Sequence, residues 1–178
     1  MNSLKKYLFN QVDVCLLIIF LGLASSLALI GAYISQYIFG YQPCILCLYQ
    51  RVPFFIVLGF VALSFLSKSD KFLKIVLYLC LAVIALNFLI AFYHVGVEFK
   101  IFVGLSGCSG ASNLNSFSDL ESLRSALENQ PAVKCDEPQF YFLGLTMAFW
   151  NMIYCLFLFI LVAFIHLKSR QNSVKKIK

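Results

Sequence analysis

Two long stretches without a charged side chain constrain the fold more than any other feature of this sequence. No Asp, Glu, Lys or Arg occurs from Val14 to Tyr49, and none occurs from Gln139 to Leu167. A helix that crosses the hydrocarbon of a bilayer needs about 20 predominantly apolar residues. Only 12% of the 178 residues are charged, against roughly 25% in a soluble domain. The sequence therefore predicts an integral membrane protein.

Four apolar segments are long enough to span a bilayer. They cover about residues 14–35, 45–66, 72–93 and 144–167. A short polar turn at 67–71 joins the second and third segments into a helical hairpin. The first apolar run is longer than the core of a signal peptide and no A-x-A cleavage site follows it, so we expect it to be retained. The predicted fold class is an all-α membrane protein, an antiparallel bundle of four transmembrane helices forming one domain over residues 1–178.

The basic residues predict the orientation of this bundle. Ten of the 14 Lys and Arg residues lie in the N-terminal segment, in the 67–74 turn and in the C-terminal tail. The other four are Arg51, Lys100, Arg124 and Lys134. Because positive residues concentrate on the cytoplasmic side, we expect both termini to be cytoplasmic and the loops at about 36–44 and 94–143 to be periplasmic. Membrane topology thus explains the net charge of +6, and no nucleic-acid partner is expected.

The long outward loop is predicted to contain one short amphipathic helix. Ser118 to Glu121 is typical of a capping box, and Pro131 is expected to end the helix. Leucines recur at helical spacing between them, at 120, 123 and 127. We expect this helix to lie along the membrane surface or to cover the bundle.

The predicted topology sorts the seven cysteines into two groups. Three fall within or at the edge of apolar segments, where free cysteine behaves as a small apolar residue: Cys15, Cys80 and Cys155. Four fall in the outward loops: Cys44, Cys47, Cys108 and Cys135. An even number of cysteines on an oxidising face of a membrane is typical of disulfides.

Cys44 and Cys47 form a C-x-x-C pair at the start of a predicted helix, directly after Pro43. Such dithiols exchange readily, because the sulfurs are prone to form thiolates and the positive end of the helix favours the anion. A zinc site is the competing use, but it would want a second C-x-x-C or a histidine pair nearby. We therefore expect no metal. Cys108 and Cys135 alone would suit an ordinary structural bridge.

Arg51 shares a helix face with the C-x-x-C, since positions 44, 47 and 51 follow an i, i+3, i+7 pattern. An arginine near the outer edge of the bilayer is costly and suggests a functional site. A guanidinium there can stabilise a thiolate or bind a carbonyl oxygen, whereas the alternative is a side chain that reaches the lipid headgroups. His94, at the outward end of the third segment, is either an interfacial residue or a second contact for the same ligand or a proton carrier.

These features together resemble the disulfide bond formation protein B (DsbB) family. The matching residues are Pro43-Cys44-Ile45-Leu46-Cys47-Leu48-Tyr49-Gln50-Arg51, Tyr93-His94, the cysteines 108 and 135, and Phe142-Leu143-Gly144-Leu145-Thr146-Met147, which is similar to a segment that opens the fourth helix. Gln50 departs from the pattern, because some members carry an acid there.

The resemblance implies a quinone-dependent protein-disulfide oxidoreductase of the bacterial inner membrane. A reduced DsbA-like thioredoxin-fold oxidase would attack Cys108, and the released Cys135 would attack the Cys44–Cys47 disulfide and pair with Cys44. Cys47, left as a thiolate, would pass electrons to a quinone that Arg51 and His94 contact. The four loop cysteines would then be catalytic, and the quinone would be ubiquinone or menaquinone.

Three other classes fit the sequence less well. In the vitamin K epoxide reductase family the loop pair precedes the C-x-x-C, whereas here it follows. A tetraspanin-type scaffold would carry a Cys-Cys-Gly run, which the sequence lacks. A transporter would show polar residues at mid-membrane, and the predicted helices offer Asn87 and a few serines.

Overall fold

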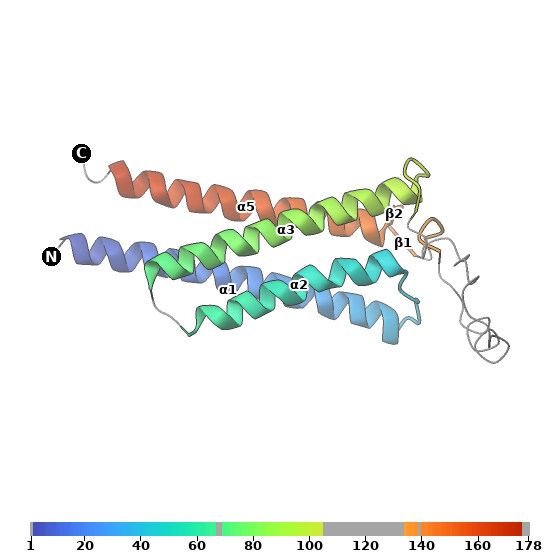
Figure 1. Ribbon diagram of the computed structural model, residues 1–178, viewed down its shortest axis with the longest axis horizontal. Helices are drawn as coiled ribbons and strands as arrows, with labels where there is room; N and C mark the ends of the chain where they lie inside the picture. Colours follow the sequence, from blue (N-terminus) through green and yellow to red (C-terminus); the bar gives the residue numbers. More distant parts are fainter. Residues whose placement is uncertain (1, 67–68, 105–133, 139, 176–178) are drawn as a thin grey trace, which may run out of the picture.

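The chain folds into a bundle of long helices with a small hairpin at one end (Figure 1). The computed structural model describes residues 2–66, 69–104, 134–138 and 140–175. The helices are α1 (Asn2–Tyr37), α2 (Ile45–Ser64), α3 (Asp70–Glu98) and α5 (Met147–Lys175). The hairpin strands are β1 (Tyr141–Phe142) and β2 (Leu145–Thr146). The predicted fold class, a four-helix membrane bundle, is confirmed.

All four helices are long and apolar enough to cross a membrane. The candidate spans are Val14–Tyr37, Ile45–Ser64, Asp70–Glu98 and Met147–Ser169. Large apolar side chains such as Leu23, Phe55 and Leu89 are exposed on the outside of the bundle. Lipid tails are as apolar as leucine, so this surface is stable in a bilayer and unsuited to water. The protein is an integral membrane protein.

The helix bounds differ from the predicted ones mainly at the membrane surfaces. The first helix begins at Asn2 rather than near residue 14, and α3 continues to Glu98 rather than ending near Tyr93. An apolar run marks only the part of a helix inside the hydrocarbon, whereas backbone hydrogen bonds continue through polar residues. His94 consequently lies inside α3 and not in the loop after it.

The sequence predicts that the F-L-G-L segment opens the last helix. In the structure this segment forms a hairpin instead. Leu143 and Gly144 both have positive φ, 52° and 78°, which is the pattern of a two-residue type I′ turn. Tyr141 pairs with Thr146 and Phe142 pairs with Leu145. The turn delays the start of α5 to Met147 and leaves Thr146 directly before it.

Helix α3 packs against α1, α2 and α5. The largest fully buried side chains of the core come from three of these helices, and they are Ile18, Leu21, Leu77, Ile84 and Leu158. The start of α1 and the end of α5 lie at one end of the bundle together with the end of α2 and the start of α3 (Figure 1). The segment before α2, the end of α3 and the hairpin lie at the opposite end. Residues far apart in the sequence therefore meet at that end.

A tight chain reversal follows α3. The backbone N–H groups of Ile101 and Phe102 both donate to the Gly96 carbonyl. The Phe102 ring lies so close to Gly96 that a Cβ atom there would clash with it. Glycine at this position lets the chain fold back over the helix end that carries His94.

Two predicted features lie outside the described residues. They are the short amphipathic helix of the long loop and the cysteine at position 108.

Candidate active site

Cys44 is the N-cap of α2, and its sulfur lies where a helix offers unpaired N–H groups. Its backbone is extended (φ −71°, ψ 169°), and its Sγ accepts a hydrogen bond of 3.3 Å from the Cys47 backbone N–H. The two sulfurs are 2.9 Å apart and share a hydrogen bond, and both cysteines are free thiols. The structure therefore represents the reduced dithiol.

The pKa of Cys44 is lowered from its ordinary value of 9.0 to about 4. The largest cause is the hydrogen bond shared with the Cys47 side chain. Burial opposes this effect, while His94 and the Cys47 backbone lower the pKa further. A cysteine at a helix N-terminus is stabilised as the anion in this way. In the dithiol the negative charge therefore rests on Cys44.

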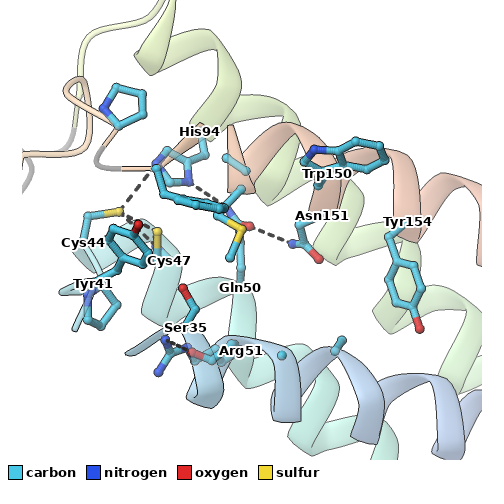
Figure 2. Close-up of a pocket in the computed structure, with 18 of the residues that line it drawn as sticks. Ser35, Tyr41, Cys44, Cys47, Gln50, Arg51, His94, Trp150, Asn151 and Tyr154 are labelled. Atoms are coloured by element: carbon cyan, nitrogen blue, oxygen red, sulfur yellow. Dashed lines mark hydrogen bonds between the residues drawn. The ribbon is translucent and has the colours of Figure 1, made fainter. Parts of the chain in front are cut away.

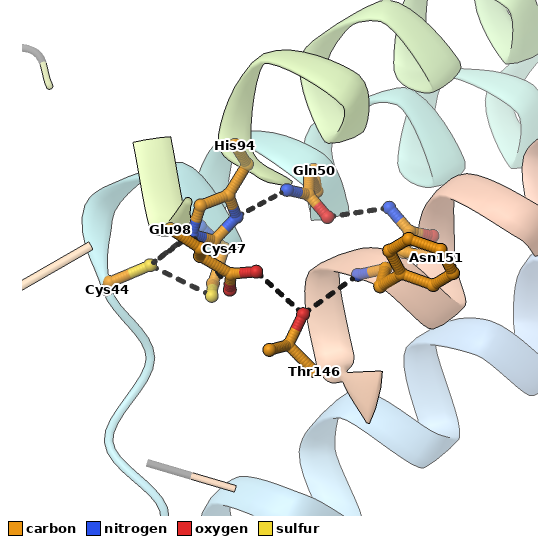
Figure 3. A network of polar contacts seen from close by, with 8 residues as sticks. Cys44, Cys47, Gln50, His94, Glu98, Thr146 and Asn151 are labelled. Atoms are coloured by element: carbon orange, nitrogen blue, oxygen red, sulfur yellow. Dashed lines mark hydrogen bonds and ion pairs between the residues drawn. The ribbon is translucent and has the colours of Figure 1, made fainter. Parts of the chain in front are cut away.

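His94 joins α3 to this thiolate. Its ring is buried, with Nε2 lying 3.5 Å from Cys44 Sγ and Nδ1 lying 2.7 Å from the Gln50 side-chain nitrogen. Because the amide nitrogen donates, Nδ1 accepts and the ring proton of the neutral imidazole sits on Nε2. Nε2 is the ring nitrogen that contacts the Cys44 sulfur (Figure 3).

A series of hydrogen bonds behind His94 runs in one direction. Cys155 Sγ donates to Asn151 Oδ1 (3.7 Å), and Asn151 Nδ2 donates to Gln50 Oε1 (2.7 Å). Gln50 then donates to the imidazole, so each amide fixes the orientation of the next. The series links α5 to α2 and to α3, and it presents a donor to the thiolate.

Glu98 adds a buried carboxylate one turn beyond His94. Its Oε1 lies 3.8 Å from His94 Nε2, and its Oε2 accepts a hydrogen bond of 2.6 Å from the Thr146 hydroxyl. Thr146 Oγ1 in turn accepts the Phe149 backbone N–H (3.2 Å) and so caps α5. The hairpin thereby positions the carboxylate next to the cysteine pair (Figure 3).

One cavity of about 620 Å³ connects these groups. Its lining includes Cys44, Cys47, Gln50, Arg51, His94 and Glu98, together with apolar side chains of α1 and α5 such as Leu27, Ile153 and Phe157. Figure 2 shows the cysteine pair and the histidine on one side of it, with Asn151 and Tyr154 farther along. Apolar walls with a few convergent polar groups are typical of a small-molecule site.

Arg51 lines the same cavity and is held by the C-terminal turns of α1. Nη1 donates to Gln36 Oε1 (2.6 Å) and Nη2 donates to the Ala32 carbonyl (3.3 Å). The guanidinium also lies over the Tyr33 ring, 5.1 Å from its centroid. A cation at the negative end of a helix is favourable. These contacts fix the guanidinium at the cavity wall.

The segment after the long loop returns to the cysteine pair. Cys135 is disulfide-bonded and buried. It packs in one cluster with Cys44, Leu46 and Val97, and it also lines the cavity. The fold thus brings a disulfide beside the reduced C-x-x-C.

The structure gathers five of the six residues singled out in the sequence around one cavity. These are Cys44, Cys47, Arg51, His94 and Cys135. The sequence analysis missed Glu98, Gln50 and Asn151 as members of the site. Glu98 follows His94 by four residues and so shares its helix face. Gln50 and Asn151 are polar side chains inside apolar spans, which is a signal of function. The sequence analysis named only Asn87 and a few serines among such residues.

Comparison with known proteins identifies the family. The family model for disulfide bond formation protein DsbB matches residues 15–165. The chain belongs to the DsbB family. It is also 27% identical over 172 residues to the uncharacterized protein RP370 of Rickettsia prowazekii (strain Madrid E), covering 96% of each chain. No solved structure matches.

Membership of the DsbB family makes this chain a membrane oxidoreductase in protein disulfide bond formation. The geometry is consistent with that chemistry, since thiol–disulfide exchange needs a thiolate and an accessible disulfide near each other. The N-cap thiolate of Cys44 and the disulfide of Cys135 lie in one cluster at one end of the bundle.

Proposed function

We propose that this protein reoxidises a DsbA-like thioredoxin-fold oxidase and passes the electrons through two disulfides to a membrane quinone. The observation that carries the proposal is the single cavity shared by the C-x-x-C, Cys135, Arg51 and His94. The long outward loop is the proposed contact of the soluble partner, and the cavity, with its apolar side chains from α1 and α5, is the proposed site of the electron acceptor.

The electron route uses two exchanges between cysteine pairs. A thiolate of the partner attacks Cys108, which breaks its bond to Cys135 and releases Cys135 as a thiolate. Cys135 then attacks Cys44, which forms a Cys44–Cys135 bond and releases Cys47 as a thiolate. The position of Cys135 in one buried cluster with Cys44 supports the second step. The partner's second thiolate then attacks the mixed disulfide, which closes the partner's disulfide and releases Cys108 as a thiolate. Oxidation of the Cys47 and Cys108 thiolates by the acceptor, with displacement of Cys135 from Cys44, restores the Cys44–Cys47 and Cys108–Cys135 bonds. The net change converts the partner's dithiol to a disulfide and delivers two electrons and two protons to the acceptor.

A quinone headgroup suits the cavity. Ligand sites usually measure roughly 300–1,000 Å³, and this cavity of about 620 Å³ has apolar walls from α1 and α5. The quinone supplies an acceptor for two electrons and two protons. Arg51 offers a fixed cation at the wall, suited to a carbonyl oxygen. His94 lines the same cavity beside Cys44 and is the second proposed contact of the quinone. Ubiquinone and menaquinone share this carbonyl chemistry.

The stabilised thiolate supports an oxidising role for the Cys44–Cys47 pair. A lowered thiol pKa stabilises the reduced dithiol relative to the disulfide, so the disulfide accepts electrons more readily. With a pKa of about 4 for Cys44 against an ordinary 9.0, this contribution is complete above pH 9.0 and shrinks as the pH falls. It vanishes below about pH 4.

The orientation follows from charge. With ten basic residues toward the termini and the α2–α3 connection, that end of the bundle is cytoplasmic. The cysteine end then faces the periplasm of a bacterial inner membrane, where disulfides persist.

A visible spectrum of the purified protein tests the proposal. Protein that carries the Cys44–Cys135 disulfide, which leaves Cys47 as the free thiolate, is mixed with short-chain analogues of ubiquinone and of menaquinone. A thiolate-to-quinone charge-transfer band is expected, with quinol formed when a reduced thioredoxin-fold oxidase is supplied. The Cys47→Ser variant should lose the band, whereas Cys80→Ser, in the core of the bundle, should keep it. The absence of both band and quinol with either quinone would refute the proposal.

A further inference from the structure

The reduced site also has the composition of a metal centre. The ligand atoms of Cys44, Cys47 and His94 all lie within 4.8 Å of one another. Two thiolate sulfurs and an imidazole nitrogen are the ligands that Zn²⁺ and related d¹⁰ cations prefer. The sequence around the C-x-x-C offers no histidine pair and no second C-x-x-C, but the fold brings His94, 47 residues after Cys47, to the cysteine pair from α3.

We propose that the reduced Cys44–Cys47 dithiol and His94 form a redox-gated binding site for a thiophilic d¹⁰ dication such as Zn²⁺. The cation binds only when the pair is reduced, because a disulfide has no thiolate to offer. Its binding displaces the protons that the two thiols still carry.

The distances fit tetrahedral coordination. With Zn–S near 2.3 Å and Zn–N near 2.0 Å, tetrahedral geometry separates a sulfur from a nitrogen by about 3.5 Å and two sulfurs by about 3.8 Å. Cys44 Sγ lies 3.5 Å from His94 Nε2 already. The two sulfurs, 2.9 Å apart, need to separate by about 0.9 Å, which a side-chain rotation of Cys47 provides.

Charge and the surrounding side chains also favour a dication. Two thiolates neutralise it, so no net charge is buried. Glu98 Oε1 lies 3.8 Å from His94 Nε2 and so places a further negative group beside the three ligands. Ligation by Nε2 requires the ring proton of His94 to sit on Nδ1. If the Gln50 and Asn151 amides each rotate by half a turn, the Gln50 oxygen faces Nδ1 and accepts that proton's hydrogen bond, and the Gln50 nitrogen donates to the Asn151 oxygen. A histidine ligand usually donates its other N–H to such an oxygen.

The occupied site would be inhibitory if the proposed function holds. Ligated sulfurs cannot form the Cys44–Cys47 disulfide, and the cation would occupy the wall of the cavity beside His94 and Glu98. The site itself does not depend on the proposed function, because binding needs neither quinone nor partner.

Titration of the full-length protein with Cd²⁺, in detergent and without quinone, tests the proposal. A Cys108→Ser, Cys135→Ser background leaves Cys44 and Cys47 as the C-x-x-C pair. Reduced protein should bind one equivalent and develop an ultraviolet thiolate-to-cadmium band, which Zn²⁺ then displaces. Protein oxidised with diamide should show no band.

Variants of the two histidines identify the third ligand. His94→Ala should weaken Cd²⁺ binding by about tenfold or more, and His94→Cys should restore it with a stronger band from a third sulfur. His166, the other histidine of the chain, is buried against Tyr78, so His166→Ala should bind like the parent. The proposal would be overturned if the reduced parent showed no band. It would also be overturned if a folded His94→Ala variant bound Cd²⁺ like the parent and His94→Cys showed no stronger band.

Discussion

Replacing His94 by alanine should raise the pKa of Cys44. The imidazole Nε2–H lies 3.5 Å from the thiolate sulfur, and both groups are buried. A hydrogen bond to a charged group contributes about 1.5–3 kcal/mol, and a change of one in pKa corresponds to about 1.4 kcal/mol. The pKa of Cys44, about 4 in the parent, should therefore rise to roughly 5–6 in His94→Ala.

The rise should stop there, because two other stabilising contacts remain. The Cys47 side chain is the largest cause of the low pKa, and the Cys47 backbone N–H adds to it. The sign is fixed, since losing a donor to the thiolate favours the protonated thiol. The thiolate should thus persist to lower pH in the parent than in the variant.

The pH dependence of alkylation measures this difference. Reduced full-length protein is treated with iodoacetamide over a range of pH, and labelling at Cys44 is followed by mass spectrometry. Only the thiolate reacts, so the midpoint of the rate profile reports the pKa. His166→Ala is the matched control and should reproduce the parent profile. Identical midpoints in His94→Ala and the parent would refute the assigned contact, as would an equal rise in His166→Ala.

The remaining predictions concern the cavity, the entry cysteine, the topology and the packing. Arg51→Ala should raise the KM for quinone in steady-state turnover by on the order of 10- to 150-fold. Arg51→Lys should recover little, because lysine lacks the planar fork that reaches both Gln36 and the Ala32 carbonyl. Native KM values in both variants would remove Arg51 from the site. Cys108→Ser should abolish exchange with the thioredoxin-fold partner while quinone still oxidises the C-x-x-C, and native turnover would make the assigned entry point wrong. A cysteine placed at Ser69 should resist membrane-impermeant maleimide in intact cells, and labelling there would reverse the proposed topology. Gly96→Ala should destabilise the detergent-solubilised protein by about 1–3 kcal/mol through its clash with Phe102, measured by thermal unfolding, whereas Gly59→Ala, with open space around it, should not.

The sequence alone determined the four membrane-spanning helices and predicted a reactive cysteine pair at the start of one of them. Uncharged stretches of bilayer length admit few structures other than transmembrane helices, because an unpaired backbone group in lipid is costly. The C-x-x-C beside Pro43 likewise predicted a thiolate-prone sulfur at the start of a helix, and Cys44 is the N-cap of α2. Both inferences depend on residues close together in the chain.

The tertiary structure decided which distant side chains complete the site. His94 meets Cys44 only because α3 packs against α2. Glu98 is held at the site only because a type I′ turn sets Thr146 at the start of α5. Asn151 reaches Gln50 from 101 positions away. Helical periodicity shows which residues share a face of one helix, but only packing decides which face of another helix lies opposite. The hydrogen-bond series of the amides and the role of His94 in the proposed metal site therefore depend on the tertiary structure.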